Sequence, residues 1–153
     1  MTNTIKSLDL DGNMFAYRKI EDKKYKYLIT HPYFVELDLS IPVDVHTIFY
    51  SIVGSNLQIF PGYKWDGASG PTIDTKNTMR ASCVHDVLYQ MIRMKQIDGS
   101  FKYAADKEFH KMMCEDSEAT NPIQKGLNTL RNGYFYWAVR LFGGFACIPG
   151  SQT

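Results

Sequence analysis

The stretch that most constrains the fold is Asp66-Gly67-Ala68-Ser69-Gly70-Pro71, which suits neither a helix nor a regular strand. Two glycines separated by two small residues and followed by a proline indicate a loop. Before this stretch the chain reads as short strands, and Pro61-Gly62 ends them. After it, apolar residues recur at helical spacing. The stretch therefore separates an N-terminal β region from a C-terminal α region.

The N-terminal third is expected to form a small antiparallel sheet. Its strands are predicted at residues 14–20, 24–29, 34–39, 47–53 and 57–60. In the third strand Val35 and Leu37 face one way, and Pro42 bounds that strand. Gly54-Ser55-Asn56 is the predicted turn between the last two strands.

Three helices are expected after the loop, over about residues 77–93, 101–114 and 121–142. Asn77 or Thr78 can cap the first helix, and Asn121-Pro122 is typical of the start of the third. The break between the first two helices is Asp98-Gly99. The predicted fold class is therefore α+β, a small N-terminal antiparallel β-sheet followed by three α-helices, in a single domain of 153 residues.

Composition limits the possible functions. The net charge of +1 gives no electrostatic footprint for nucleic acid, so no nucleic-acid partner is expected. No membrane span is expected either, because no run of about 18 apolar residues occurs. Cys83, Cys114 and Cys147 form no Cys-x-x-Cys pair, which argues against a disulfide framework or a cysteine zinc site. A reducing, cytoplasmic setting fits this cysteine usage.

The first predicted helix carries an adjacent histidine and aspartate, His85 and Asp86. Their side chains point about 100° apart around the helix, so one can act on a substrate or water while the other binds a cation. The preceding loop of small residues lets backbone carbonyls approach the same cation. Asp106 lies on the second helix, which can fold back, and can hold the second imidazole nitrogen and fix its tautomer.

This constellation predicts a hydrolase-like site. His85 would deprotonate a water molecule, and Asp106 would orient His85. Asp86, with Asp66 and loop carbonyls, would bind Ca²⁺ or another divalent cation. The metal would stabilise the oxyanion formed on an ester or similar carbonyl.

The arrangement resembles the site of secreted phospholipase A2, where a Gly-rich calcium loop precedes a helix bearing His-Asp-x-Cys-Tyr. Here the helix reads His85-Asp86-Val87-Leu88-Tyr89, with Leu in place of Cys. The resemblance covers roughly residues 62 to 110 and implies that Tyr89 hydrogen-bonds to Asp106. In this resemblance Gly67, Gly70 and Pro71 lie in the loop and Arg80 lies five residues before His85; Ser69 is a further residue of the loop. The loop departs from that class at Asp66 and Ser69.

A second resemblance covers residues 60 to 143. Asp-Gly-Ala-Ser-x-Pro, Arg-Ala, His-Asp-x-Leu-Tyr, Ala-Asp-x-x-Phe and Ala-Val-x-x-Phe-Gly follow in that order, at residues 66–71, 80–81, 85–89, 105–109 and 138–143. This order is similar to an uncharacterised family of phage and prophage proteins, the domain of unknown function 1353. The resemblance implies a phage-encoded protein of the host cytoplasm or virion with a shared site, and it names no substrate.

Two other interpretations of the same residues remain. Asp66, Arg80, His85 and Asp106 could form a buried polar network in a non-enzymatic virion, assembly or host-interaction protein. The partner would then be a phage or host protein, or a small ligand bound without turnover. A metal set of His46, His85, Asp86 and Asp106 would resemble His…His-Asp…Asp phosphohydrolases, which need the first His on a helix, and residues 44–50 do not look helical. An open pocket at His85 would favour chemistry, and full burial would favour the network.

Overall fold

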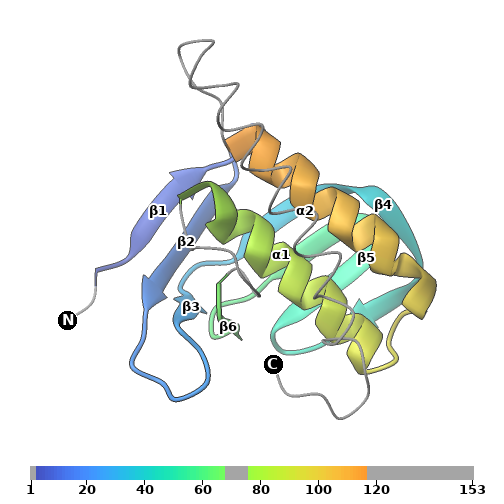
Figure 1. The fold of residues 1–153 in the computed structure, drawn as a ribbon, viewed down its shortest axis with the longest axis horizontal. Helices are drawn as coiled ribbons and strands as arrows, with labels where there is room; N and C mark the ends of the chain where they lie inside the picture. Colours follow the sequence, from blue (N-terminus) through green and yellow to red (C-terminus); the bar gives the residue numbers. More distant parts are fainter. Residues whose placement is uncertain (1–2, 68–75, 117–153) are drawn as a thin grey trace. The chain divides into compact units, whose positions relative to one another are not determined.

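The computed structural model describes residues 3–67 and 76–116 (Figure 1). The chain divides into two compact units, Met1–Asp66 and Gly67–Thr153. The expectation of a single domain stays a prediction.

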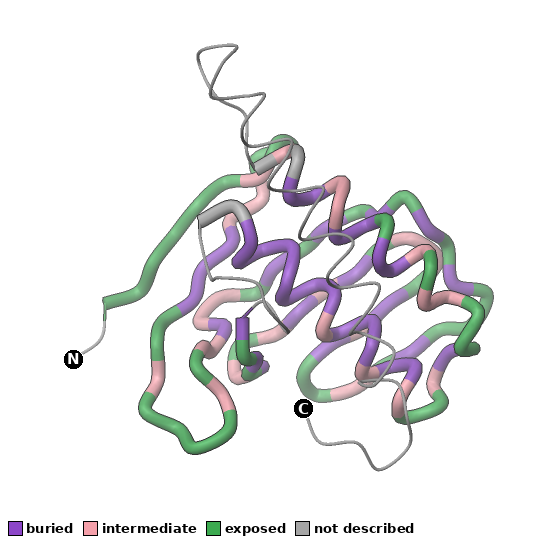
Figure 2. Tube along the Cα trace, viewed as in Figure 1, coloured by how far each residue is buried: buried purple, intermediate pink, exposed green. Residues whose placement is uncertain are grey.

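The first unit contains two antiparallel sheets. Its strands are β1 (Ile5–Leu8), β2 (Met14–Lys19), β3 (Tyr27–Ile29), β4 (Tyr33–His46), β5 (Tyr50–Ile59) and β6 (Lys64–Trp65). One sheet has the order β1-β2-β3-β6, and the other is the β4–β5 pair. Buried and exposed residues alternate along most of β4, as expected for a strand with one face in the core (Figure 2).

A cluster of aromatic side chains forms the core of the four-stranded sheet. Trp65 is fully buried, and its ring centroid lies 5.4 Å from that of Tyr27, 5.6 Å from Tyr17 and 6.0 Å from Phe15. Tyr33 extends the cluster and donates a hydrogen bond from its hydroxyl to Asp9 Oδ2 at 2.9 Å. Such tilted and edge-to-face contacts suit the ring quadrupoles, and they add to the stability that burial gives.

The β4–β5 hairpin differs from its prediction in length and in the position of its turn. β4 does not end at Pro42, because that residue lies in the second of two register shifts, between Ile41 and Val45, where the regular ladder is interrupted. Gly54 is not in a turn but opposite Ile41 within β5, with φ of +60°. The turn instead follows Thr47, whose Oγ1 accepts hydrogen bonds from the backbone N–H groups of Phe49 and Tyr50.

The described part of the second unit is a pair of helices. α1 spans Lys76–Arg93, a 3₁₀ turn spans Gly99–Phe101, and α2 spans Lys102–Asp116. Asp98 caps the 3₁₀ turn by accepting a hydrogen bond from the Ser100 N–H at 2.8 Å. Nearly every described side chain of α1 up to Ile92 is buried, and α2 is buried along one stripe. No helix among the described residues has the length and apolar character needed to cross a membrane.

The predicted fold class is wrong. The described residues contain two sheets with six strands and two α-helices, rather than a small sheet followed by three helices. The error arose partly because β1 is exposed throughout and β6 has only two residues, so neither shows the apolar alternation of a half-buried strand. The third predicted helix, at about residues 121–142, lies outside the described residues.

Gly54 provides a test of the β4–β5 geometry. A Cβ added there would meet only Ser40 Oγ at 3.9 Å, an ordinary contact, so the cost of Gly54→Ala comes from its positive φ. We expect the free energy of unfolding to fall by about 1–2 kcal/mol in a chemical denaturation experiment. Gly99→Ala is the matched control, because Gly99 has open space and no positive φ. Equal stability of the two variants would contradict the left-handed conformation at Gly54.

Candidate functional site

The candidate site lies between α1 and α2, which run side by side (Figure 1). Two contacts fix their relative direction. His85 of α1 contacts Asp106 of α2, and Arg80, earlier on α1, contacts Glu115, later on α2. The helices are therefore antiparallel, and the 3₁₀ turn with its Asp98 cap returns the chain between them.

His85 and Asp106 form the centre of the site. His85 Nε2 lies 2.8 Å from Asp106 Oδ1, and the Asp106 side chain is 0% exposed. An ionised Asp106 only accepts hydrogen bonds, and with such a partner the proton of a neutral imidazole lies on Nε2. In the neutral imidazole Nδ1 then holds the lone pair, which makes Nδ1 the nitrogen that can act as a base.

Tyr89 and Phe109 hold the imidazole of His85 in place. Tyr89 lies one helical turn after His85, and its hydroxyl donates to the same Asp106 oxygen at 2.5 Å. The ring centroids of His85 and Tyr89 are 4.0 Å apart. Phe109 approaches the imidazole from α2 edge-on, with a centroid distance of 5.3 Å. Sequence reasoning placed Phe109 in the Ala-Asp-x-x-Phe motif and gave it no contact with His85, although its position three residues after Asp106 places both on one side of α2.

His85 itself is buried, with 7% of its surface exposed. Its ring is therefore surrounded by protein, and the hydrogen bond to Asp106 is shielded from water. Shielding strengthens this hydrogen bond and the one from Tyr89. This burial is closer to the polar-network interpretation than to an open pocket at His85, and that interpretation stays a prediction.

Arg80 belongs to a second cluster of charges. Its Nη2 donates to Glu115 Oε2 at 2.9 Å, and the Arg80 side chain is buried. Lys111 Nζ lies 3.5 Å from Glu115 Oε1 and 3.6 Å from Glu108 Oε1. A buried guanidinium requires such a carboxylate, so this cluster joins the start of α1 to the end of α2. Sequence reasoning missed Glu108, Lys111 and Glu115, although their spacing of three and four residues on one helix signals charge pairs.

The predicted cation ligands are only partly described. Asp86 is half-buried on α1, Asp66 is exposed at the end of the first unit, and Gly67 is buried with φ of +80°. Ser69, Gly70 and Pro71 lie outside the described residues. Within the described ranges, no three His, Cys, Asp or Glu side chains come together as metal ligands.

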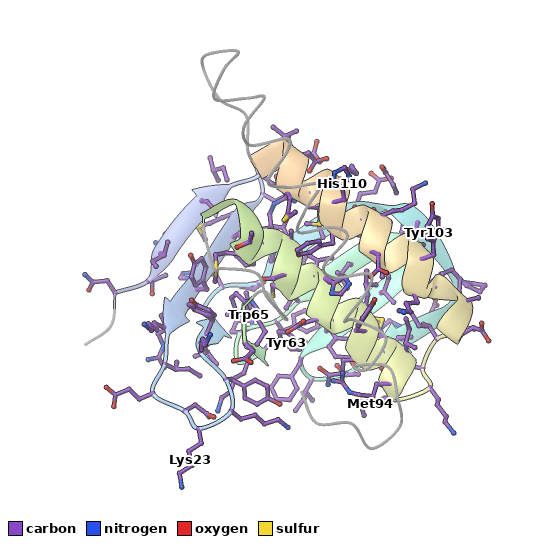
Figure 3. All side chains as sticks on the ribbon, in the orientation of Figure 1. Lys23, Tyr63, Trp65, Met94, Tyr103 and His110 are labelled. Carbon is purple, nitrogen blue, oxygen red and sulfur yellow. The ribbon has the colours of Figure 1, made fainter. Side chains whose placement is uncertain are left out.

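The remaining candidate residues lie elsewhere. His46 is in strand β4, not on a helix, and its Nδ1 lies 2.8 Å from Ser51 Oγ, so the phosphohydrolase interpretation lacks its first helical histidine. Burial, and after it the charge of Asp86, raises the pKa of the Cys83 thiol well above its ordinary value. A thiol that stays protonated is a poor nucleophile, so Cys83 is a core residue. His110 is partly exposed on α2 (Figure 3).

Comparison of the chain with protein-family models, with curated proteins and with solved structures gives no match. The two resemblances seen in the sequence therefore stay predictions. The contacts among His85, Tyr89, Asp106 and Phe109 carry the functional proposal.

Tyr89→Phe tests the hydrogen bond to the buried carboxylate. The substitution removes one donor from Asp106 and leaves the ring in place, so we expect a loss of about 1.5–3 kcal/mol in the free energy of unfolding. Tyr103→Phe is the matched control, because Tyr103 is 54% exposed on α2 and should change stability by less than about 0.5 kcal/mol (Figure 3). If Tyr89→Phe were as neutral as the control, the hydroxyl would not stabilise Asp106.

Proposed function

We propose that this protein is a phage-encoded hydrolase in which His85 is the general base and Asp106 orients it. The observation that supports this most directly is the 2.8 Å contact between His85 Nε2 and a fully buried Asp106. That contact selects the tautomer in which Nδ1 can accept a proton. A carboxylate that fixes the tautomer of a histidine in this way usually accompanies a histidine that acts as a general base.

The reaction proposed is hydrolysis of an ester or a similar carbonyl compound. Nδ1 of His85 takes a proton from water as the water oxygen attacks the carbonyl carbon. The tetrahedral intermediate then breaks its bond to the leaving oxygen, which takes the proton back from Nδ1. The products are an acid and an alcohol, and His85 is regenerated. Asp106 would stabilise the transient imidazolium through Nε2.

A divalent cation is a separate part of the proposal. The described residues do not form a metal site by themselves, since they bring no three ligand side chains together. The sequence prediction places Ca²⁺ at Asp86, with Asp66 and loop carbonyls; Asp66 belongs to the other unit, and residues 68–75 lie outside the described residues. If bound there, the cation would supply a positive charge for the oxyanion.

The second candidate function is non-enzymatic, and the burial of His85 favours it. A histidine that is only 7% exposed, clamped by Tyr89 and Phe109, can serve as part of a polar network that fixes α1 against α2. The protein would then act through its surface, as a virion, assembly or host-interaction component. If the protein is a hydrolase, loss of the His85 imidazole removes an activity. If His85 belongs to a structural network, its loss lowers the stability of the fold.

His85→Gln tests these alternatives. Glutamine can still donate to Asp106 but cannot act as a base, so hydrolysis of p-nitrophenyl esters of graded chain length should fall in kcat by about 100-fold or more. Thermal denaturation, followed in parallel, should show only a small loss of stability. Asp106→Asn should lower kcat as well, because an amide does not select the required tautomer.

The control for this experiment is His110→Gln, which changes the histidine of α2 and should leave kcat unchanged. Retention of full ester hydrolysis by His85→Gln would refute the proposed base. A wild-type protein without ester hydrolysis, together with a loss of several kcal/mol in His85→Ala, would support the structural network.

Cation binding is tested by thermal denaturation after treatment with a chelator. If Asp86 and Asp66 bind a divalent cation, added Ca²⁺ or Zn²⁺ should raise the melting temperature of the wild type, because the ion binds only the folded state. Asp86→Asn and Asp66→Asn should abolish that shift. Asp38→Asn, on the exposed face of β4, is the matched control and should keep it. An unchanged melting temperature with every divalent ion would rule out the metal and leave the His85–Asp106 proposal standing.

A further inference from the structure

The hydrogen bond to Asp106 restrains one rotation of the His85 imidazole only weakly. The imidazole turns about its Cβ–Cγ bond, and the minima of this torsion, χ2, are broad. Nε2 lies at the far end of the ring, close to the line of that bond, so the turn moves Nε2 little. Nδ1 lies further from the same line and moves more. The partner of Nε2, Asp106 Oδ1 at 2.8 Å, therefore fixes the tautomer better than it fixes the direction of Nδ1.

Two aromatic rings contact the imidazole of His85 and restrict this rotation. The centroid of the Tyr89 ring lies 4.0 Å from that of the imidazole, with 42° between the two planes. The Phe109 ring lies at 5.3 Å, with 62° between the planes. Tyr89 belongs to the same helix as His85, whereas Phe109 belongs to α2. Contacts from two helices at two inclinations restrict χ2 more than a hydrogen bond at one atom of the ring does.

The position of Phe109 is itself closely defined by packing. Its side chain is 2% exposed, and Met112 and Met113, on the same buried stripe of α2, are 1% and 0% exposed. Side chains in such a close-packed interior occupy defined rotamers. Phe109 also lies one turn after Asp106, so one helix carries both the hydrogen-bond acceptor and the aromatic ring. The two groups therefore approach His85 with a constant relative geometry.

We propose that Phe109 is a positioning residue, which fixes χ2 of His85 and with it the direction of the Nδ1 lone pair. The catalytic consequence rests on the proposed function, in which Nδ1 takes a proton from water. A general base must lie within hydrogen-bond reach of the proton that it removes. A misplacement of about 1 Å can lower a rate roughly 100-fold. Asp106 selects which nitrogen is the base, and Phe109 sets where that nitrogen points.

Phe109→Leu removes the ring and keeps an apolar side chain between the helices. We expect the imidazole of His85 to become more mobile, which lowers the order parameter obtained from ¹³C relaxation of its ring carbons. The tautomer, measured from two-bond ¹H–¹⁵N correlation spectra, should remain the one protonated on Nε2, because Asp106 is unchanged. Asp106→Asn, in contrast, should change the tautomer populations.

Steady-state kinetics provide a readout that a purely structural role of Phe109 would not change. With p-nitrophenyl esters, kcat of Phe109→Leu should fall about tenfold while KM stays within about twofold, because Phe109 contacts the base and not the substrate. The matched control is Met112→Leu, which alters another buried apolar side chain of α2. It should leave both kcat and the order parameter of the imidazole unchanged. All variants are compared below their melting transitions, so that each is folded.

Three results would overturn the proposal. The first is an imidazole as ordered in Phe109→Leu as in the wild type. The second is an equal effect of Met112→Leu, which would indicate a general response to altered core packing. The third is an unchanged kcat in Phe109→Leu despite a mobile imidazole.

Failure of the proposed function would give a different result. A wild-type chain without ester hydrolysis would refute the hydrolase. The order parameter of the His85 ring is measured without substrate, so it would still decide whether Phe109 fixes χ2.

Discussion

The candidate site depends on one buried carboxylate. Asp106 has no exposed surface, and burying an ion without partners would cost several kcal/mol. His85 and Tyr89 repay part of that cost by hydrogen-bonding to a single oxygen of Asp106. The same contacts fix the separation and the rotation of α1 and α2. The hydrogen bonds to Asp106 thus stabilise the helix pair and also orient His85, the proposed base.

The sequence allowed the residues of this site to be found because helices are periodic. His85 and Tyr89 are four residues apart, so they share a face of α1. The Asp98-Gly99 break indicated that the second helix returns beside the first, which brought Asp106 into reach. Phe109 and the Arg80–Glu115 pair were not foreseen as parts of the helix interface. Which charges meet across two helices depends on their relative rotation, and that rotation does not follow from the pattern of either helix alone.

The sheets were predicted less well, for reasons that can be traced to particular residues. Pro42 and Gly54 are ordinary signs of a strand end and a turn, yet both lie inside the β4–β5 pair. Two register shifts accommodate them by adding residues to β4, so that fourteen residues pair with ten. A bulge depends on which residues of the partner strand are paired, so the sequence of β4 alone does not indicate where one occurs. The four-stranded sheet was missed at its edges, because β1 is exposed throughout and β6 has only two residues, of which Trp65 is buried.

The short connection between α1 and α2 has a consequence for how the chain acquires its site. His85 and Asp106 are 21 residues apart, and the entropy of closing a loop grows only slowly with its length. Contacts between residues so close in sequence are characteristic of fast-folding helical structures. The helical hairpin can therefore form its polar centre soon after both helices have been synthesised. Substitutions in the sheets should consequently change the overall folding rate more than they change the geometry around His85.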